Sequence, residues 1–231
     1  MAEHTLSILK PSVNNLAARI FLRAAGLDFE ERDVWGKKDA PDFMQKDPAL
    51  LTPMLECDGL PRGSLWESCA IMQYICNRDG LDQLYPRDPA ERAMVDSAMF
   101  YLIGTLYPVV ARATYPTLHF PQYAGEAATS DADDEVKAKA AKDAEAAIAM
   151  PLEVYREFFL DGKRFIGGDH PTIADIRLAA TLEFLRSIDY DFPAWAEEYM
   201  AAVEEALGDA YSEPAADVRG YVESVKAPAS A

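Results

Sequence analysis

The sequence predicts a small α/β domain with a mixed sheet, followed by a domain made only of helices. Two observations carry this prediction. Residues 1–79 alternate short apolar runs with helical periodicity, whereas the periodic segments after residue 89 all have helical spacing. Between them, residues 80–88 contain Gly80 and Pro86, a composition typical of a linker between domains. We therefore place the two domains at 1–79 and 89–231.

A strand–helix–strand unit opens the chain. The apolar run Thr5–Leu9 is closed by Pro11, as expected of a buried strand. Apolar residues then recur at helical spacing over residues 16–24, and Gly26 follows as a helix stop signal. Phe29–Trp35 has the composition of a second strand. A unit of about thirty residues is the size of a crossover that joins two parallel strands.

A hairpin and a helix complete the first domain. Thr52–Cys57 and Gly63–Leu65 are two short strand-like runs separated by the turn signal Asp58-Gly59. Glu67–Arg78 has a helical apolar face. Antiparallel pairing in this hairpin, added to the parallel unit before it, predicts the mixed sheet.

The second domain is expected to hold five helical segments and one clear helix start. In the long first segment, Pro108 predicts a kink. Thr172 and Asp175 have the spacing of a capping box, in which a hydroxyl and a carboxylate satisfy N–H groups at a helix start. The acidic segment 125–135 has no functional interpretation. The expected helical segments are 89–118, 136–160, 173–188, 195–207 and 212–225.

Composition excludes several classes of protein. The chain has 39 acidic and 22 basic residues, a formal net charge of −17. Such a charge repels nucleic acid and anionic membrane surfaces. No apolar run approaches about 18 residues, so no transmembrane helix is expected. The start lacks a secretory signal, and three cysteines do not form a disulfide framework, so a reduced, cytoplasmic protein is predicted.

The chain also lacks the motifs of several common active sites. It has no glycine-rich phosphate loop, no GxSxG, no HExxH and no Cys/His cluster with metal spacing. No metal site or hydrolase triad is therefore expected. Cys69 and Cys76 lie on one face of a predicted helix and are interpreted as buried core thiols.

The segment between the first strand and the first helix is the strongest candidate site. Ser12, Asn14 and Asn15 place a hydroxyl and two amides at a helix N-terminus, where free N–H groups and the helix dipole favour an anion. The structural alternative is that Asn14 or Asn15 is simply the N-cap of that helix.

Two further candidates lie in the hairpin and the helix after it. The Glu67-Ser68 pair at a helix N-terminus has groups that suit an amino-acid headgroup, although an acidic residue there also complements the helix dipole. The Thr52-Pro53 peptide opens a strand. If it is cis, the backbone of Thr52 is available to pair with a peptide ligand; a trans proline at a strand edge is the alternative.

Together, these segments resemble the cytosolic glutathione transferase family along nearly the whole chain. The resemblance is carried by five stretches: SILKPSVNNLAARIFLRAAGLDFEERDV, LTPMLECDG, LWESCAIMQYI, YPRDPAERAMV and FIGGDHPTIADI. It implies a thioredoxin-like N-terminal domain, an all-helical C-terminal domain and a homodimer. The PSVN stretch most resembles the bacterial nu-like class, and other features are similar to theta-like and bacterial etherase-type members.

The resemblance implies a set of glutathione-binding residues. Glu67 and Ser68 fall where the family binds the γ-glutamyl group. The backbone of Thr52, before the expected cis Pro53, would pair with the cysteinyl peptide. Lys38 falls where theta-like members place a basic residue near the glycyl carboxylate.

The resemblance also implies which residues surround the glutathione sulfur. In a nu-like alignment these are Ser12 and Asn14, which we favour; in etherase-like or theta-like alignments Asn14 or Asn15 takes that place. Leu51 departs from the family because many members carry Lys or Gln there. The first strand ends without a tyrosine and no cysteine follows Pro11, which argues against the tyrosine-type and thiol-exchange classes.

The implied activity is attack of a bound glutathione thiolate on an electrophilic carbon of a small hydrophobic substrate, without a metal. Aromatic residues of the first helical segment are expected to line the substrate pocket, although they also suit a helical core. Alternatives are a glutathione-dependent epoxide-opening, ether-cleaving or dehalogenating enzyme, and a glutathione-binding protein without catalysis. The expected pocket residues are Phe100, Tyr101, Tyr107, Tyr115 and Phe120.

Overall fold

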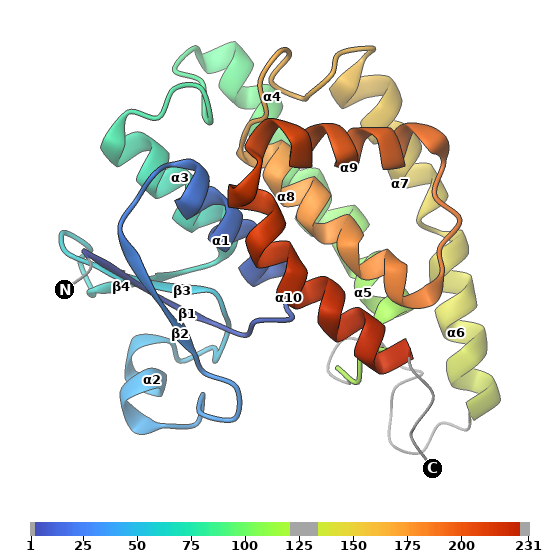
Figure 1. Ribbon diagram of the computed structural model, residues 1–231, viewed down its shortest axis with the longest axis horizontal. Coiled ribbons are helices and arrows are strands. Elements are labelled where there is room, and N and C mark those ends of the chain that lie inside the picture. The colour runs from blue at the N-terminus through green and yellow to red at the C-terminus, as the bar shows by residue number, and fades with distance from the viewer. Residues whose placement is uncertain (1–2, 121–133, 227–231) are drawn as a thin grey trace.

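The chain folds into a sheet-containing N-terminal half and a helical C-terminal half, which lie side by side (Figure 1). The computed structural model describes residues 3–120 and 134–226; most of the acidic segment 125–135 lies outside them. The elements of the N-terminal half are β1 (His4–Ile8), α1 (Val13–Ala24), β2 (Phe29–Asp33), α2 (Pro41–Lys46), β3 (Met54–Cys57), β4 (Ser64–Trp66) and α3 (Ser68–Asp79).

Helices make up the described part of the C-terminal half. They include π-helical turns, η1 and η4, and a 3-10 helix, η5. The elements are α4 (Pro89–Tyr101), η1 (Leu102–Leu106), α5 (Tyr107–Thr114), α6 (Asp134–Ala146), α7 (Ala149–Val154), η4 (Tyr155–Leu160), α8 (Ile173–Leu182), η5 (Glu183–Ile188), α9 (Ala194–Leu207) and α10 (Asp209–Lys226).

The sheet is mixed, as predicted, with strand order β2-β1-β3-β4. β1 runs parallel to β2 and antiparallel to β3, and β3 runs antiparallel to β4. Ser7 pairs with Met54, and Met54 pairs with Trp66. The register therefore brings the ends of β1, β2 and β4 and the start of β3 to one edge, which we call the active edge.

Helix α1 is largely buried. Its apolar side chains, such as Leu16, Ile20 and Phe21, are fully buried. It packs on α3 in its own half and on α8 and α10 of the helical half, and Figure 1 shows α10 running past it. The expected helix 212–225 thus begins earlier, at Asp209, and is part of the contact between the two halves.

An arginine on α1 secures this contact. Arg19, only 3% exposed, donates from Nε to Glu31 Oε1 of β2 (2.9 Å) and from Nη2 to Asp217 Oδ2 of α10 (2.7 Å). Its Nη1 donates to the carbonyl oxygen of Pro214 (3.3 Å). One buried cation therefore joins three elements from both halves, with its charge matched by two carboxylates.

The kink expected at Pro108 takes the form of a widened turn. The helix runs without a break over residues 89–114, and η1 ends at Leu106, two residues before the proline. Proline has no N–H to bond to the carbonyl four residues earlier, and its ring crowds that carbonyl. The π turn accommodates this because the Tyr107 N–H bonds instead to the Leu102 carbonyl, five residues earlier.

The same helix corrects the expectation that the chain contains no helix able to span a membrane. Pro89–Thr114 is long and apolar enough to do so by length and composition. A core helix of a globular protein meets the same criterion. Here one side is buried in the protein core, through Val95, Met99, Leu106 and Val110.

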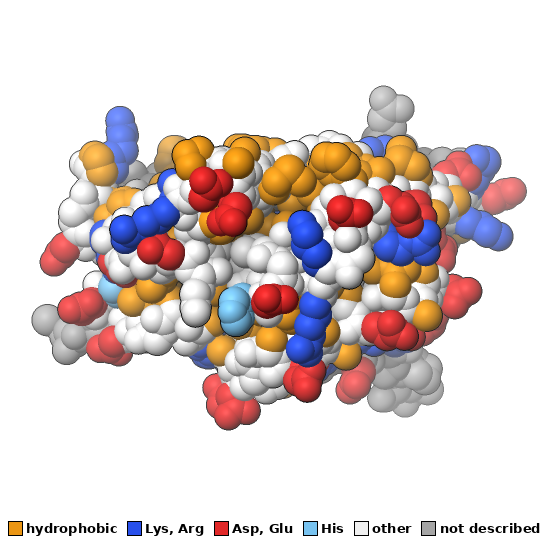
Figure 2. Space-filling model, turned by 90° about the horizontal axis from the view of Figure 1, so that it is seen from above, with side chains coloured by type: hydrophobic (Ala, Val, Ile, Leu, Met, Phe, Trp, Pro, Cys, Tyr) orange, Lys and Arg blue, Asp and Glu red, His pale blue; other side chains and the backbone are white. Residues whose placement is uncertain are grey.

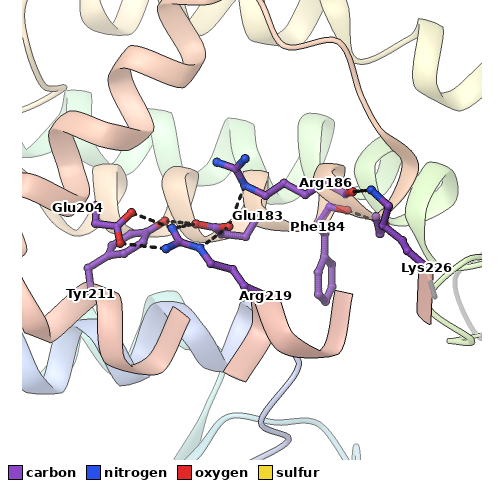
Figure 3. A network of polar contacts seen from close by, with 8 residues as sticks. Glu183, Phe184, Arg186, Glu204, Tyr211, Arg219 and Lys226 are labelled. Carbon is purple, nitrogen blue, oxygen red and sulfur yellow. Dashed lines mark hydrogen bonds and ion pairs between the residues drawn. The ribbon is translucent and has the colours of Figure 1, made fainter. Parts of the chain in front are cut away.

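A second ionic cluster joins the last three elements of the helical half (Figure 3). Glu183 of η5 is 1% exposed and accepts from Arg219 Nη2 (2.6 Å) and from the Tyr211 hydroxyl (3.0 Å). Arg219 also donates to both carboxylate oxygens of Glu204 on α9 (3.0 and 2.8 Å). Arg219 therefore compensates a buried carboxylate and fixes α10 against α9.

We expect Arg219→Met to lower the free energy of unfolding by about 2–3 kcal/mol, because it removes the main partner of buried Glu183. Urea denaturation at neutral pH measures this. The control is Arg164→Met, which breaks the exposed Arg164–Glu205 pair and is expected to cost less than about 1 kcal/mol. Equal losses in the two variants would contradict this account.

The Arg219 effect should also depend on pH. Hydrogen bonds from Arg219 hold the pKa of Glu204 below its usual range, against the opposing effect of burial. A carboxylate whose pKa is lower in the folded state stabilises the fold at pH values above its unfolded pKa of about 4.3. This stabilisation is lost as the pH falls through the folded-state pKa. The difference between wild type and Arg219→Met should therefore shrink in acid.

Candidate functional site

The structure brings the sequence-predicted glutathione residues together at the active edge. Ser12 follows β1, Lys38 follows β2, Pro53 precedes β3 and Glu67 follows β4. The Thr52–Pro53 peptide is cis, as predicted. Four segments that are distant in the sequence thus meet because the strand register places their ends side by side.

Ser12 is the N-cap residue of α1, with extended backbone angles (φ −83°, ψ 128°). Its side chain makes no capping hydrogen bond, whereas its carbonyl accepts from the Leu16 N–H (2.8 Å). The interpretation of Asn14 or Asn15 as the N-cap is therefore wrong, since both lie inside the first turn. The Ser12 hydroxyl lies where the first-turn N–H groups and the helix dipole favour an anion.

Asn15 joins α1 to the loop that carries the cis proline. Its side chain is fully buried, and Nδ2 donates to Thr52 Oγ1 (3.1 Å). Within the described residues, Asn15 Oδ1 has no hydrogen-bond partner. The side chain that bonds to Thr52 therefore also carries a buried amide oxygen without a partner among the described residues.

Asn14 is bound by the helical half on both sides of its amide. Its Oδ1 accepts from Arg177 Nη2 (2.5 Å), and its Nδ2 donates to the Tyr107 hydroxyl (2.8 Å). The hydroxyls of Tyr107 and Tyr115 are 2.6 Å apart. An amide nitrogen carries two hydrogens, so the second N–H of Asn14 has no partner among the described residues.

Arg177 was missed by the sequence analysis. Its signal is present, since it is a single charged residue in the otherwise apolar stretch that follows Asp175. The structure places it on α8, 3% exposed, with its guanidinium 5.2 Å from the centre of the Tyr107 ring. Only the tertiary contact between α8 and α1 connects it with the site.

The start of α8 is held by the predicted capping residues. Asp175 is fully buried, and one of its oxygens accepts from the Thr172 N–H (2.8 Å) and hydroxyl (2.7 Å). The other accepts from the Ile166 N–H and the Tyr199 hydroxyl, both at 2.8 Å. The capping box is confirmed, and it fixes the helix that carries Arg177.

Lys38 and Asp47 shape the loop before the cis proline. Lys38 Nζ donates to the Leu50 carbonyl (2.7 Å), which leaves two ammonium hydrogens for another acceptor. Buried Asp47 accepts from the Ala49 N–H (3.0 Å), and burial raises the pKa of its carboxyl group. Both residues stabilise the backbone that leads to Thr52.

Glu67 and Ser68 lie where β4 passes into α3. Glu67 is exposed and has a φ of 75°, a conformation that L-residues rarely adopt. Such strain, of about 1–3 kcal/mol, clusters at functional sites. Ser68 is the first residue of α3 and is buried. The carboxylate of Glu67 and the α3 N-terminus therefore lie next to each other at the active edge.

The expected aromatic wall divides into two groups. Tyr107 and Tyr115 belong to the hydrogen-bonded chain that begins at Asn14. Phe100 is 68% exposed, and the Tyr101 ring packs instead against Tyr155, with ring centres 5.7 Å apart. Phe100 and Tyr101 are therefore not part of the hydrogen-bonded series Asn14–Tyr107–Tyr115.

Trp35 and Tyr221, which the sequence did not point to, extend the group around Tyr115. The expected residue Phe120 connects them: its ring centre lies 5.4 Å from that of Tyr115, 5.9 Å from that of Tyr221 of α10, on which it stacks, and 6.0 Å from that of Trp35. Trp35 follows β2, so both halves of the chain contribute to this aromatic cluster. No group of three or more potential metal ligands occurs in the described part of the chain.

Comparisons with known proteins agree with this architecture. The sequence model described as "Glutathione S-transferase, N-terminal domain" matches residues 4–77, and that described as "Glutathione S-transferase, C-terminal domain" matches residues 134–204. Together the two matched ranges span more than half of the chain.

Solved structures of glutathione transferases are similar over almost the full length. One from Bombyx mori shares 26% identity with a TM-score of 0.73, covering 96% of this chain and 97% of that one. A delta-class enzyme from Nilaparvata lugens shares 25% identity, TM-score 0.73, over 96% and 100%. Human glutathione-S-transferase T1-1 has the same fold, with 24% identity and a TM-score of 0.79 over 95% and 91%. The chain belongs to the glutathione transferase family.

Proposed function

We propose that this chain binds glutathione at the active edge, stabilises its thiolate and attacks an electrophilic carbon of a small hydrophobic substrate. The observation that carries this proposal is the Ser12 hydroxyl, which makes no capping bond at the N-terminal end of α1. The cis Pro53 and the α3 N-terminus share the same edge. We also propose that the protein acts in the cytoplasm.

Each part of glutathione has a complementary group at this edge. Glu67 and the α3 N-terminus beside Ser68 suit the ammonium and carboxylate of the γ-glutamyl group. The backbone of Thr52 suits the cysteinyl peptide. Lys38, with two ammonium hydrogens left over, suits the glycyl carboxylate and replaces the polar residue that is absent at Leu51.

Ser12 and Asn14 would activate the sulfur. A cysteine-like thiol has a pKa of about 8.5, and lowering it by about two units requires about 2.7 kcal/mol of preferential stabilisation of the thiolate. The Ser12 hydroxyl, the second N–H of Asn14 and the α1 N-terminus together supply charge-assisted hydrogen bonds of about 1.5–3 kcal/mol each. Asn15 then acts through Thr52 rather than on the sulfur.

The reaction needs no metal. The thiol proton leaves to solvent, and the thiolate forms a bond to the electrophilic carbon. In a displacement the leaving group departs with its electron pair; in an addition or ring opening the displaced pair takes up a proton. We place the electrophile against Tyr107, Tyr115, Phe120, Trp35 and Tyr221, where the Tyr107 hydroxyl lies beside Asn14.

Phe100 and Tyr101 are left out of this substrate site, and Phe100 suits a dimer interface instead. We propose that two copies of the chain pair through an exposed apolar face of the helical half. The elements that carry this face are neighbours, since α4 contacts η4 and α7 contacts η1. Figure 2 shows hydrophobic side chains gathered along one edge of the molecule. The exposed apolar residues of these elements are Met94, Phe100, Ile103, Met150 and Phe158.

We expect Ser12→Ala to raise the pKa of bound glutathione by about one unit and to lower kcat/KM at neutral pH by at least about tenfold, because the thiolate loses a hydrogen bond. Thiolate absorbance against pH, and turnover of a model electrophile, measure these effects. Stability should be unchanged, since the hydroxyl makes no capping bond. Ser224→Ala, which removes an exposed hydroxyl on α10, is the control.

Three other outcomes would change the proposal. An unshifted thiol in the wild-type complex would overturn the catalytic proposal and leave a glutathione-binding protein. A lowered pKa that Ser12→Ala does not alter would move the activating role to Asn14. Turnover confined to epoxides, ethers or halides would select the corresponding degradative enzyme.

We expect Phe100→Glu to weaken dimerisation by at least about tenfold, because a charge would be buried without a partner in an apolar interface. Light scattering coupled to gel filtration, over a range of concentrations, measures the change. Met44→Glu is the matched control, since Met44 is also exposed (46%) but lies on α2 of the other half. A monomeric wild type, or equal weakening by both variants, would contradict this interface.

A further inference from the structure

Arg177 is a buried cation without an anionic partner among the described residues. Its Nη2 donates to Asn14 Oδ1 and its Nη1 to Thr181 Oγ1, each at 2.5 Å. Its Nε is buried and makes no hydrogen bond to the part of the chain that the structure describes. Arg19 is equally buried but pairs with two carboxylates. Of these two buried arginines, Arg19 is therefore compensated by carboxylates, whereas Arg177 has none among the described residues.

The other titratable groups around Arg177 do not neutralise it. Cys69 of α3 and Tyr155 of η4 interact with its charge, but burial raises the pKa of both, so they remain neutral. Tyr107 of α5 offers the face of its ring. Asp175 on the same helix directs its carboxylate oxygens to Ile166, Thr172 and Tyr199.

A buried charge of this kind lowers the stability of the fold unless a nearby anion compensates it. The nearest place for an anion follows from the contacts. Asn14 lies in the first turn of α1, and Arg177 bonds directly to its amide oxygen. The α1 N-terminus also favours negative charge. The unmatched guanidinium and the proposed thiolate position therefore lie on two sides of one asparagine.

We propose that Arg177 is a positioning residue of the glutathione site, which orients the Asn14 amide toward the sulfur and supplies the buried positive charge that favours bound thiolate. This inference rests on the proposed function. By holding Oδ1, Arg177 fixes the orientation of the amide, whose Nδ2 donates to the Tyr107 hydroxyl. A guanidinium bond to the amide oxygen also polarises the amide, so its remaining N–H becomes a better donor.

The test compares two ligands that differ only at the sulfur. Glutathione forms a thiolate, whereas S-methylglutathione is a neutral thioether that fills the same subsites. In Arg177→Met we expect affinity for glutathione at neutral pH to fall by about tenfold relative to S-methylglutathione, and the pKa of the bound thiol to rise by about one unit. Arg177→Lys keeps the charge and should recover part of both effects.

Arg19→Met is the matched control. It removes the other buried interface arginine, so it should lower stability without changing the ligand ratio or the pKa of the bound thiol. A parallel loss of affinity for both ligands in Arg177→Met would show a merely structural role and overturn the inference. If wild-type protein itself shows no lowered thiol pKa, the proposed function fails instead.

If Arg177→Met does not fold, Asn14→Asp tests the role of Arg177 instead. The substitution places a carboxylate within bonding distance of Arg177 and so supplies the missing counter-charge at the interface. We expect the variant to be at least as stable as wild type while the pKa of the bound thiol rises by about one unit or more. An unchanged thiol pKa in this folded variant would overturn the inference.

Discussion

The placement of α1 between the two halves of the chain is the constraint on which the site depends. The helix is fixed by packing of Leu16, Ile20 and Phe21 and by two polar contacts on its flank. Arg19 ties it to β2 and α10, and Asn14 ties it to α8. The helix therefore cannot turn about its axis without breaking buried hydrogen bonds. Its N-terminus, with Ser12, is held at the edge where the other binding segments end.

The two buried arginines serve different ends. The Arg19 charge is neutralised by Glu31 and Asp217, so it contributes to cohesion between the halves. Arg177 has polar partners but no described carboxylate, and such an arrangement lowers stability unless a negative charge is bound nearby. The difference follows from position, because Arg177 of α8 contacts the first turn of α1 through Asn14, whereas Arg19 lies near the middle of α1.

Much of the binding edge was predictable because its information is local. The end of each strand is marked by proline, glycine or a change of periodicity, and the mixed sheet places those ends together. The capping box was likewise predictable from Thr172 and Asp175. The positions of the aromatic residues were harder to predict, because helical spacing alone does not indicate which neighbour a ring contacts. Phe100 thus lies on the surface, while Trp35 and Tyr221 complete a cluster that no spacing links.

The sequence by itself determined the order of elements, the family and the segments that form the active edge. Periodicity, turn residues and helix caps act over a few residues, so they can be recognised in the sequence. Only the tertiary structure decided that Ser12 rather than an asparagine is the N-cap, that Asn14 is bound from both sides, and that Arg177 reaches it. Asn14 and Arg177 are 163 positions apart, and packing of α8 on α1 alone makes them neighbours.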